Sequence, residues 1–187
     1  MQEQNQTRTL IIERAKKLFA AQGYAQTSMR DIAQSARLST GPLYFHFKDK
    51  KDILEAILTE AYETFGKAIT ALPTQAETTL AQIELVLTEY LELYQREKIY
   101  FEICNHITLS GENLATNAIQ LISALEKRIT HHLQQIITHG VANGELRKGD
   151  PQNLALALQS MVQGLTETAE NISTKNVIKE ILNILKA

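Results

Sequence analysis

The segment that most restricts how this chain can fold is residues 27–51, TSMRDIAQSARLSTGPLYFHFKDKK. It contains two helix-start signals eleven residues apart, Ser28 and Ser39. Ser28 and Asp31 have the spacing of a capping box, in which each side chain binds the backbone N–H of the other residue. Pro42 falls in the first turn of the second helix, where a missing N–H costs nothing. Two short helices joined by a tight link predict a helix-turn-helix that binds DNA.

The rest of the chain also has the pattern of helices. Its three prolines and eight glycines lie mostly at expected helix ends, and apolar residues recur three and four positions apart. No segment has the alternation of a strand, so we expect an all-α protein of about nine helices. Seven of these helices span residues 7–22, 29–33, 40–45, 50–72, 75–95, 98–110 and 112–139, and two more begin after Asp150 and Ser173.

Charge is divided unevenly along the chain. Residues 1–51 contain nine Lys and Arg against four Asp and Glu, whereas residues 52–187 contain ten against seventeen. A basic front on an acidic body suits a protein whose N-terminal part binds a polyanion.

Other classes of protein find little support. Cys104 is the only cysteine, so an intrachain disulfide and a Cys-based zinc cluster are excluded. No apolar run approaches the roughly 20 residues of a membrane helix, and the N-terminus lacks the apolar core of a secretory signal. We therefore expect a cytoplasmic protein without a membrane partner. The sequence contains no phosphate-binding glycine loop, nucleophile elbow or H-E-x-x-H motif, so it predicts no enzyme, cofactor or metal site.

The second short helix has side chains suited to the major groove. This groove is about 12 Å wide and admits one helix, whose first residues meet base edges. Thr40 can hydrogen-bond a base or place its methyl against thymine, Gly41 allows close backbone approach, and Pro42 offers an apolar ring. Leu43 is expected to turn inward onto the neighbouring helices.

Further polar side chains can bind the DNA backbone. Tyr44 and His46 lie near the end of this helix and can donate to phosphate oxygens. Lys50 stands at the start of the next helix, where its ammonium and the helix dipole both favour a phosphate. The opposite phosphate strand is expected to meet the start of the first short helix, at Thr27, Ser28 and Arg30.

Each of these assignments has a structural alternative. Tyr44, Phe45 and Phe47 can be core residues of a small bundle, which is the favoured role for Phe47. His46 can be an exposed polar residue without a binding role, and Thr27 and Ser28 can serve as caps alone, a role that is compatible with a phosphate contact.

Residues 27–51 resemble the DNA-binding segment of TetR-type transcriptional regulators, whose pattern reads roughly T-x-x-x-I-A-x-x-A-x-[VL]-S-x-G-x-[LI]-Y-x-[HY]-F-x-[SDN]-K. Two positions depart from it, because Arg37 replaces a common glycine and Pro42 replaces a small polar residue. The residues in register are Thr27, Ile32, Ala33, Ala36, Leu38, Ser39, Gly41, Leu43, Tyr44, His46, Phe47, Asp49 and Lys50.

The resemblance implies an all-helical homodimer. Residues 1–51 would form a helix-turn-helix DNA-binding domain, and residues 52–187 a helical effector-binding and dimerisation domain. Family members usually repress transcription and release a palindromic operator when a small molecule enters the body. The helices after Asp150 and Ser173 would pair with their mates in a four-helix bundle.

The effector pocket is expected between about residues 78 and 140. Aromatic and half-polar side chains are concentrated there, as in many small-molecule sites, although core packing is the favoured role for any single one of them. A helical small-molecule-binding dimer without specific DNA recognition is the alternative function, supported by Arg37 and Pro42. The candidate pocket residues are Tyr90, Tyr94, Tyr100, Phe101, Cys104 and His106.

Overall fold

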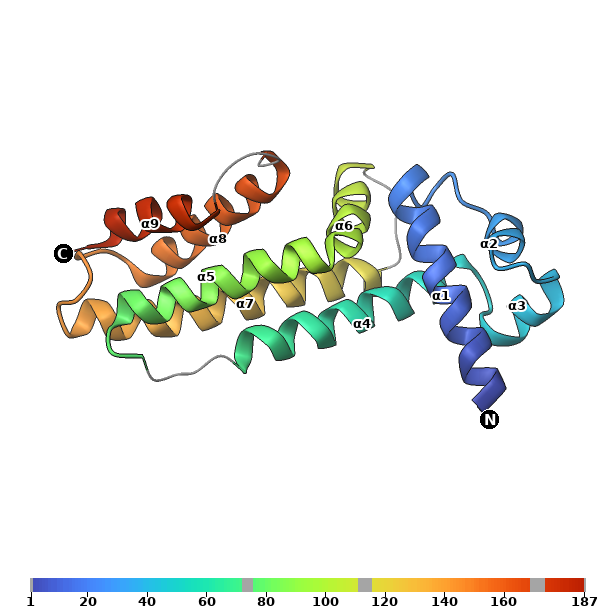
Figure 1. The fold of residues 1–187 in the computed structure, drawn as a ribbon, viewed down its shortest axis with the longest axis horizontal. Coiled ribbons are helices and arrows are strands. Elements are labelled where there is room, and N and C mark those ends of the chain that lie inside the picture. Colours follow the sequence, from blue (N-terminus) through green and yellow to red (C-terminus); the bar gives the residue numbers. More distant parts are fainter. Residues whose placement is uncertain (1, 72–75, 111–115, 169–173, 187) are drawn as a thin grey trace. The chain divides into compact units, whose positions relative to one another are not determined.

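The structure, a computed structural model, describes residues 2–71, 76–110, 116–168 and 174–186. These residues form nine α-helices and no strand beyond an isolated antiparallel bridge between Leu146 and Lys186, so the predicted all-α class is confirmed (Figure 1). The helices are α1 (Gln2–Gln22), α2 (Met29–Ser35), α3 (Thr40–His46), α4 (Lys50–Thr70), α5 (Thr79–Arg96), α6 (Lys98–Ser110), α7 (Thr116–Ala142), α8 (Pro151–Thr168) and α9 (Thr174–Leu185).

The first helix is longer than its apolar pattern predicts. It begins at Gln2, five residues before the expected start, because the Gln and Glu residues that dominate its opening are good helix formers although they carry no apolar stripe. It ends as predicted at Gly23, whose φ of 83° suits glycine and whose N–H donates to the carbonyl oxygen of Phe19 at 3.0 Å. Phe19 is fully buried.

The predicted capping box at the start of α2 is present. The backbone N–H of Ser28 donates to Oδ2 of Asp31 at 2.8 Å, and the backbone N–H of Asp31 donates to Oγ of Ser28 at 3.2 Å. The Ser28 hydroxyl also donates to Oδ2 of Asp31 at 2.6 Å. These hydrogen bonds, first from the hydroxyl and then from the N–H of Ser28, lower the pKa of the Asp31 carboxyl.

The link between α2 and α3 is a Schellman turn. The N–H of Arg37 donates to the carbonyl oxygen of Gln34 at 3.0 Å, and that of Leu38 donates to the carbonyl oxygen of Ala33 at 2.9 Å. Arg37 has a φ of 57°, in the left-handed region that favours glycine.

Replacing Arg37 with glycine is therefore expected to stabilise the protein. The left-handed conformation costs a residue with a side chain about 1–2 kcal/mol. Glycine avoids this cost, but its greater freedom in the unfolded chain offsets part of the gain in stability. We expect the free energy of unfolding to rise by about 0.5–1 kcal/mol in urea titrations followed by circular dichroism. An unchanged or lower stability of Arg37→Gly would show that the arginine side chain makes a compensating interaction.

Two aspartate side chains accept backbone hydrogen bonds at the start of α4. The N–H of Asp52 donates to Oδ1 of Asp49 at 2.9 Å, and the N–H of Lys48 donates to Oδ2 of Asp52 at 3.1 Å. The helix ends at Thr70; the break expected at Pro73 falls outside the described residues.

By its internal contacts the chain divides into two compact units. The first contains residues 1–63 and 97–123, and the second contains residues 64–96 and 124–187. Within the first unit α6 packs along α1, and within the second α5 packs with α8 and α9. The division at residue 51 into a DNA-binding and an effector-binding domain concerns function, and it stays a prediction.

In the second unit, the apolar residues that recur along α8 at positions 154, 158, 161, 162 and 165 are mostly buried within the chain. Leu154, Leu158 and Val162 are buried, whereas Met161 is 45% exposed; the side chain of Leu165 lies outside the described set. The helix restarts as predicted, since Oδ1 of Asp150 accepts a hydrogen bond from the N–H of Asn153 at 3.0 Å and Pro151 is the first helical residue. Across the described part of the chain, no helix is long and apolar enough to span a bilayer.

Candidate nucleic-acid interface

One side of α3 belongs to the core and the other faces solvent. Leu43 is fully buried and Phe47 is 3% exposed, so the predicted inward roles of both are confirmed. Thr40, Gly41 and Pro42 are all exposed at the first turn, where the sequence places the base-reading positions. The start of α3 is thus open to a partner.

Two large aromatic side chains stand on the exposed side of α3. Tyr44 is 55% exposed and Phe45 is 71% exposed, so the core alternative is wrong for both. The Phe45 ring makes an edge contact with the half-buried His46, with ring centroids 5.2 Å apart. Sequence reasoning did not include Phe45 among the DNA-contacting residues, because an apolar side chain near Leu43 suits a core equally well.

Thr27 is turned into the protein and does not face the solvent, where a phosphate would bind. Its side chain is buried at 1% exposure, and its hydroxyl donates to the carbonyl oxygen of Gly23 at 2.8 Å. Nε2 of Gln22 donates to the same hydroxyl at 3.2 Å. Thr27 therefore fixes the link between α1 and α2, whereas Ser28 and Arg30 are exposed at the start of α2.

Lys50 also holds this link in place. Its ammonium donates to the carbonyl oxygens of Tyr24 at 2.6 Å and Ala25 at 3.3 Å, and it lies 4.2 Å from the centroid of the Tyr24 ring. The side chain is half-buried, so a phosphate contact would have to share its ammonium with these groups. The neighbouring Lys48 and Lys51, which the sequence reasoning left out of the site, are exposed.

A groove between α1 and α4 in the first unit has the opposite electrostatic character. Arg8 is the one cation among its lining residues, and its guanidinium lies 5.1 Å from the centroid of the Phe47 ring. Phosphate oxygens would be repelled by the carboxylates that line it, so this groove is unsuited to DNA. The acidic residues that line the groove are Glu13, Asp52, Glu55, Glu60 and Glu63.

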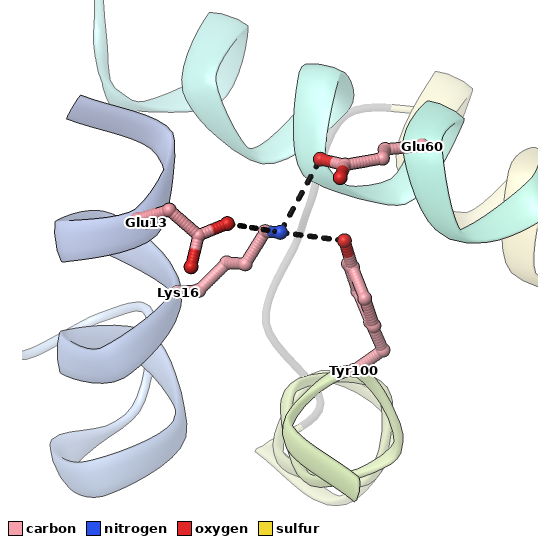
Figure 2. A network of polar contacts seen from close by, with 4 residues as sticks. All are labelled: Glu13, Lys16, Glu60 and Tyr100. Carbon is pink, nitrogen blue, oxygen red and sulfur yellow. Dashed lines mark hydrogen bonds and ion pairs between the residues drawn. The ribbon is translucent and has the colours of Figure 1, made fainter. Parts of the chain in front are cut away.

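A buried lysine joins α1, α4 and α6 within the first unit (Figure 2). The ammonium of Lys16, whose side chain is 6% exposed, lies 2.7 Å from a carboxylate oxygen of Glu13 and 3.3 Å from one of Glu60. It donates to the hydroxyl of Tyr100 at 2.6 Å and lies 4.5 Å from the centroid of the same ring. Glu13 and Glu60 are about half exposed, so water still reaches both carboxylates.

This environment keeps Lys16 charged. Burial alone would lower the pKa of its ammonium, but the hydrogen bonds to Glu13 and Tyr100 and the charge of Glu60 raise it above the usual value. Burial raises the pKa of Tyr100 to about 12, against the opposing effect of the lysine, so the phenol stays protonated. The network is therefore a permanent tie between the three helices at neutral pH.

The candidate pocket residues are divided between the two compact units. Tyr90 lines a small apolar cavity of the second unit, together with residues of α5, α7 and α8, and Tyr94 is half-buried in the same unit. Tyr100 belongs to the Lys16 network in the first unit, where Phe101 and Cys104 are half-buried and His106 is exposed. A common pocket for all six residues stays a prediction.

Comparison with known proteins accords with this geometry. Residues 11–57 match the family model described as "Bacterial regulatory proteins, tetR family", and residues 76–167 match "Tetracyclin repressor-like, C-terminal domain". The HTH-type transcriptional regulator TtgR of Pseudomonas putida is 29% identical over 171 residues, which cover 88% of this chain and 80% of the relative.

Solved structures share the fold. A tetR-family regulatory protein from Rhodococcus RHA1 superposes with a TM-score of 0.84 at 23% identity, covering 97% of each chain. AibR, in complex with isovaleryl coenzyme A and operator DNA, superposes with a TM-score of 0.78 at 18% identity, covering 96% of this chain and 98% of that one. The two family models and the exposed helix-turn-helix together lead to one conclusion. The chain belongs to the tetR family of bacterial regulatory proteins and is a DNA-binding transcriptional regulator.

Proposed function

We propose that this regulator is a repressor that binds a palindromic operator as a homodimer and releases it when a small molecule binds to the body. The observation that carries the proposal is the exposed first turn of α3, with Thr40, Gly41 and Pro42 open to solvent. This turn lies in the part of the sequence where Lys and Arg outnumber Asp and Glu. Since genomic DNA is the partner, we also propose a cytoplasmic location.

The roles within the reading head follow from exposure. Thr40 donates or accepts at a base edge, while Tyr44 and His46 donate to phosphate oxygens. Arg30, before α3 in the chain, and Lys48, after it, are both exposed and supply positive charge, and Ser28 contributes its hydroxyl. Because Thr27 is buried, its role is to hold the link that positions this surface. Lys50 stabilises the α1–α2 link and also binds a phosphate within reach of its ammonium.

Dimerisation is proposed to use the outer face of α8. Because Leu154, Leu158 and Val162 are buried within the chain, the exposed residues left for a partner are Leu156 (55% exposed), Met161 (45% exposed) and smaller residues beside them. Small side chains allow two helices to approach closely, and a Cβ added at Gly164 would meet nothing within 4 Å. The smaller residues of this face are Ala157, Ser160 and Gly164.

The effector is proposed to be mainly apolar. The cavity beside Tyr90 is lined by Val86, Leu87 and Leu133, among other residues, and is of the order of a single water molecule in size. Pockets for small molecules usually measure about 300–1,000 Å³, so an effector would have to separate α5, α7 and α8 as it enters. The Tyr90 hydroxyl and the Gln159 amide would then be the polar groups that orient it.

Selection of DNA from a random duplex library tests the DNA-binding part of this proposal. We expect the full-length protein to enrich a palindromic sequence whose half-sites are about one helical turn apart. If the dimer neutralises about four to six phosphates, affinity should fall by roughly two to three orders of magnitude between about 50 and 200 mM salt. Fluorescence anisotropy with the enriched duplex measures this decline.

A scrambled duplex of the same composition is the control. Equal affinity for the enriched and the scrambled duplex at about 150 mM salt would reject specific DNA recognition and favour the alternative, a helical small-molecule-binding dimer. Enrichment of a sequence without two-fold symmetry would reject the symmetrical dimer.

A further inference from the structure

Phe45 lies on the outermost face of α3. Successive residues of an α-helix are about 100° apart, so Phe45 and Gly41 each point about 160° away from the buried Leu43. Phe45 is the most exposed large apolar side chain among the described residues, at 71%. A Cβ added at Gly41 would meet nothing within 4 Å, so the surface one turn before Phe45 is also open.

The exposed ring is continuous with the surface assigned to DNA. Tyr44 and His46 flank it in the chain, and the edge contact with the imidazole of His46 braces one side of the ring. The first turn of the same helix carries the base-reading positions. A helix that enters the major groove with Leu43 facing the core would therefore place Phe45 against the groove floor.

We propose that Phe45 reads the 5-methyl group of thymine. A phenyl ring has neither a donor nor an acceptor, so it cannot bind phosphate oxygens or the hydrogen-bonding edges of bases. The thymine methyl is the apolar group that base pairs present in the major groove, and apolar side chains recognise it by contact. Phe45 is thus a specificity-determining residue, beside the hydrogen bonding assigned to Thr40.

The inference rests on the proposed function and is tested with the duplex enriched from the random library. In synthetic versions of this duplex each thymine is replaced in turn by deoxyuridine, which lacks only the methyl group. We expect one position in each half-site at which the replacement weakens binding of the wild-type protein about fourfold, or about fifteenfold when both half-sites are changed. Phe45→Ala should bind the thymine and uracil duplexes equally at that position.

Two variants keep the interpretation unambiguous. Thr40→Ser removes the other methyl group that can meet thymine but should retain the uracil penalty set by Phe45. Phe45→Leu keeps an apolar side chain and should retain part of that penalty, and both Phe45 variants should fold normally because the ring is exposed.

The outcomes separate the two proposals. The inference would be overturned if a duplex is enriched but no replacement of thymine by deoxyuridine weakens binding in a way that depends on Phe45. The proposed function would then still stand. The same holds if Phe45→Ala weakens the thymine and uracil duplexes by the same factor, because the ring would then contact DNA without reading the methyl. Failure to enrich any duplex would overturn both proposals.

Discussion

Lys16→Met is expected to lower the free energy of unfolding by about 2 kcal/mol, because a buried ammonium loses its charge-assisted hydrogen bonds to Glu13 and Tyr100 and its ion pair with Glu60. Methionine preserves most of the buried aliphatic volume, so the loss reports the polar network. Urea unfolding at neutral pH measures it. Lys17→Met is the matched control, since this neighbouring lysine is exposed, and its effect should stay within about 0.5 kcal/mol.

A double-mutant cycle with Tyr100→Phe isolates the contact between lysine and phenol. We expect a coupling free energy of about 1 kcal/mol between the two positions; purely additive losses would mean that the 2.6 Å contact contributes nothing of its own. Because folding raises the pKa of Lys16, its contribution is fully present below the pKa of an unfolded lysine, about 10.4, and is lost only as pH rises through the folded value. The effect of Lys16→Met should therefore be constant from about pH 6 to 9.

Gly41→Ala is expected to separate DNA binding from stability. Nothing in the protein lies within 4 Å of a Cβ at this position, and alanine is the better helix former, so the free energy of unfolding should stay constant or rise by up to about 1 kcal/mol. The added methyl group would keep the helix backbone from approaching the groove. We expect binding to the enriched duplex to weaken about ten- to a hundredfold.

Anisotropy titrations and thermal unfolding, carried out on the same preparation, measure the two effects. Unchanged affinity of Gly41→Ala would show that α3 does not approach the DNA through its first turn. A drop in stability would instead show that the position is constrained by the protein itself, and the change in affinity could then not be assigned to the groove.

Sequence reasoning succeeded where an interaction joins residues close together in the chain. The capping box of Ser28 and Asp31 and the stop at Gly23 both depend on neighbours within four positions. Side-chain type and spacing determine such contacts almost completely. The inward turn of Leu43 followed from the same local periodicity.

It was incomplete where the partner is distant, and it left alternatives where two locations suit one side chain. Lys16 and Tyr100 are 84 positions apart, so no local pattern indicated their contact. The apolar stripe of α8 suits a core and a dimer equally well, and only the packing against α5 decides between them. Thr27 suits a phosphate contact and a buried hydrogen bond alike.

The contact between α1 and α6 limits how far the chain can be shortened around the helix-turn-helix. The helix-turn-helix depends on α1, and α1 packs along a helix that begins at Lys98 and covers its buried lysine. A fragment that stopped after the helix-turn-helix would leave the Lys16 ammonium without Tyr100 and Glu60 and would uncover the apolar side of α1. We therefore expect a stable DNA-binding fragment to require α6 as well as the helix-turn-helix, so that cutting the chain after residue 51 would not yield a module that folds on its own.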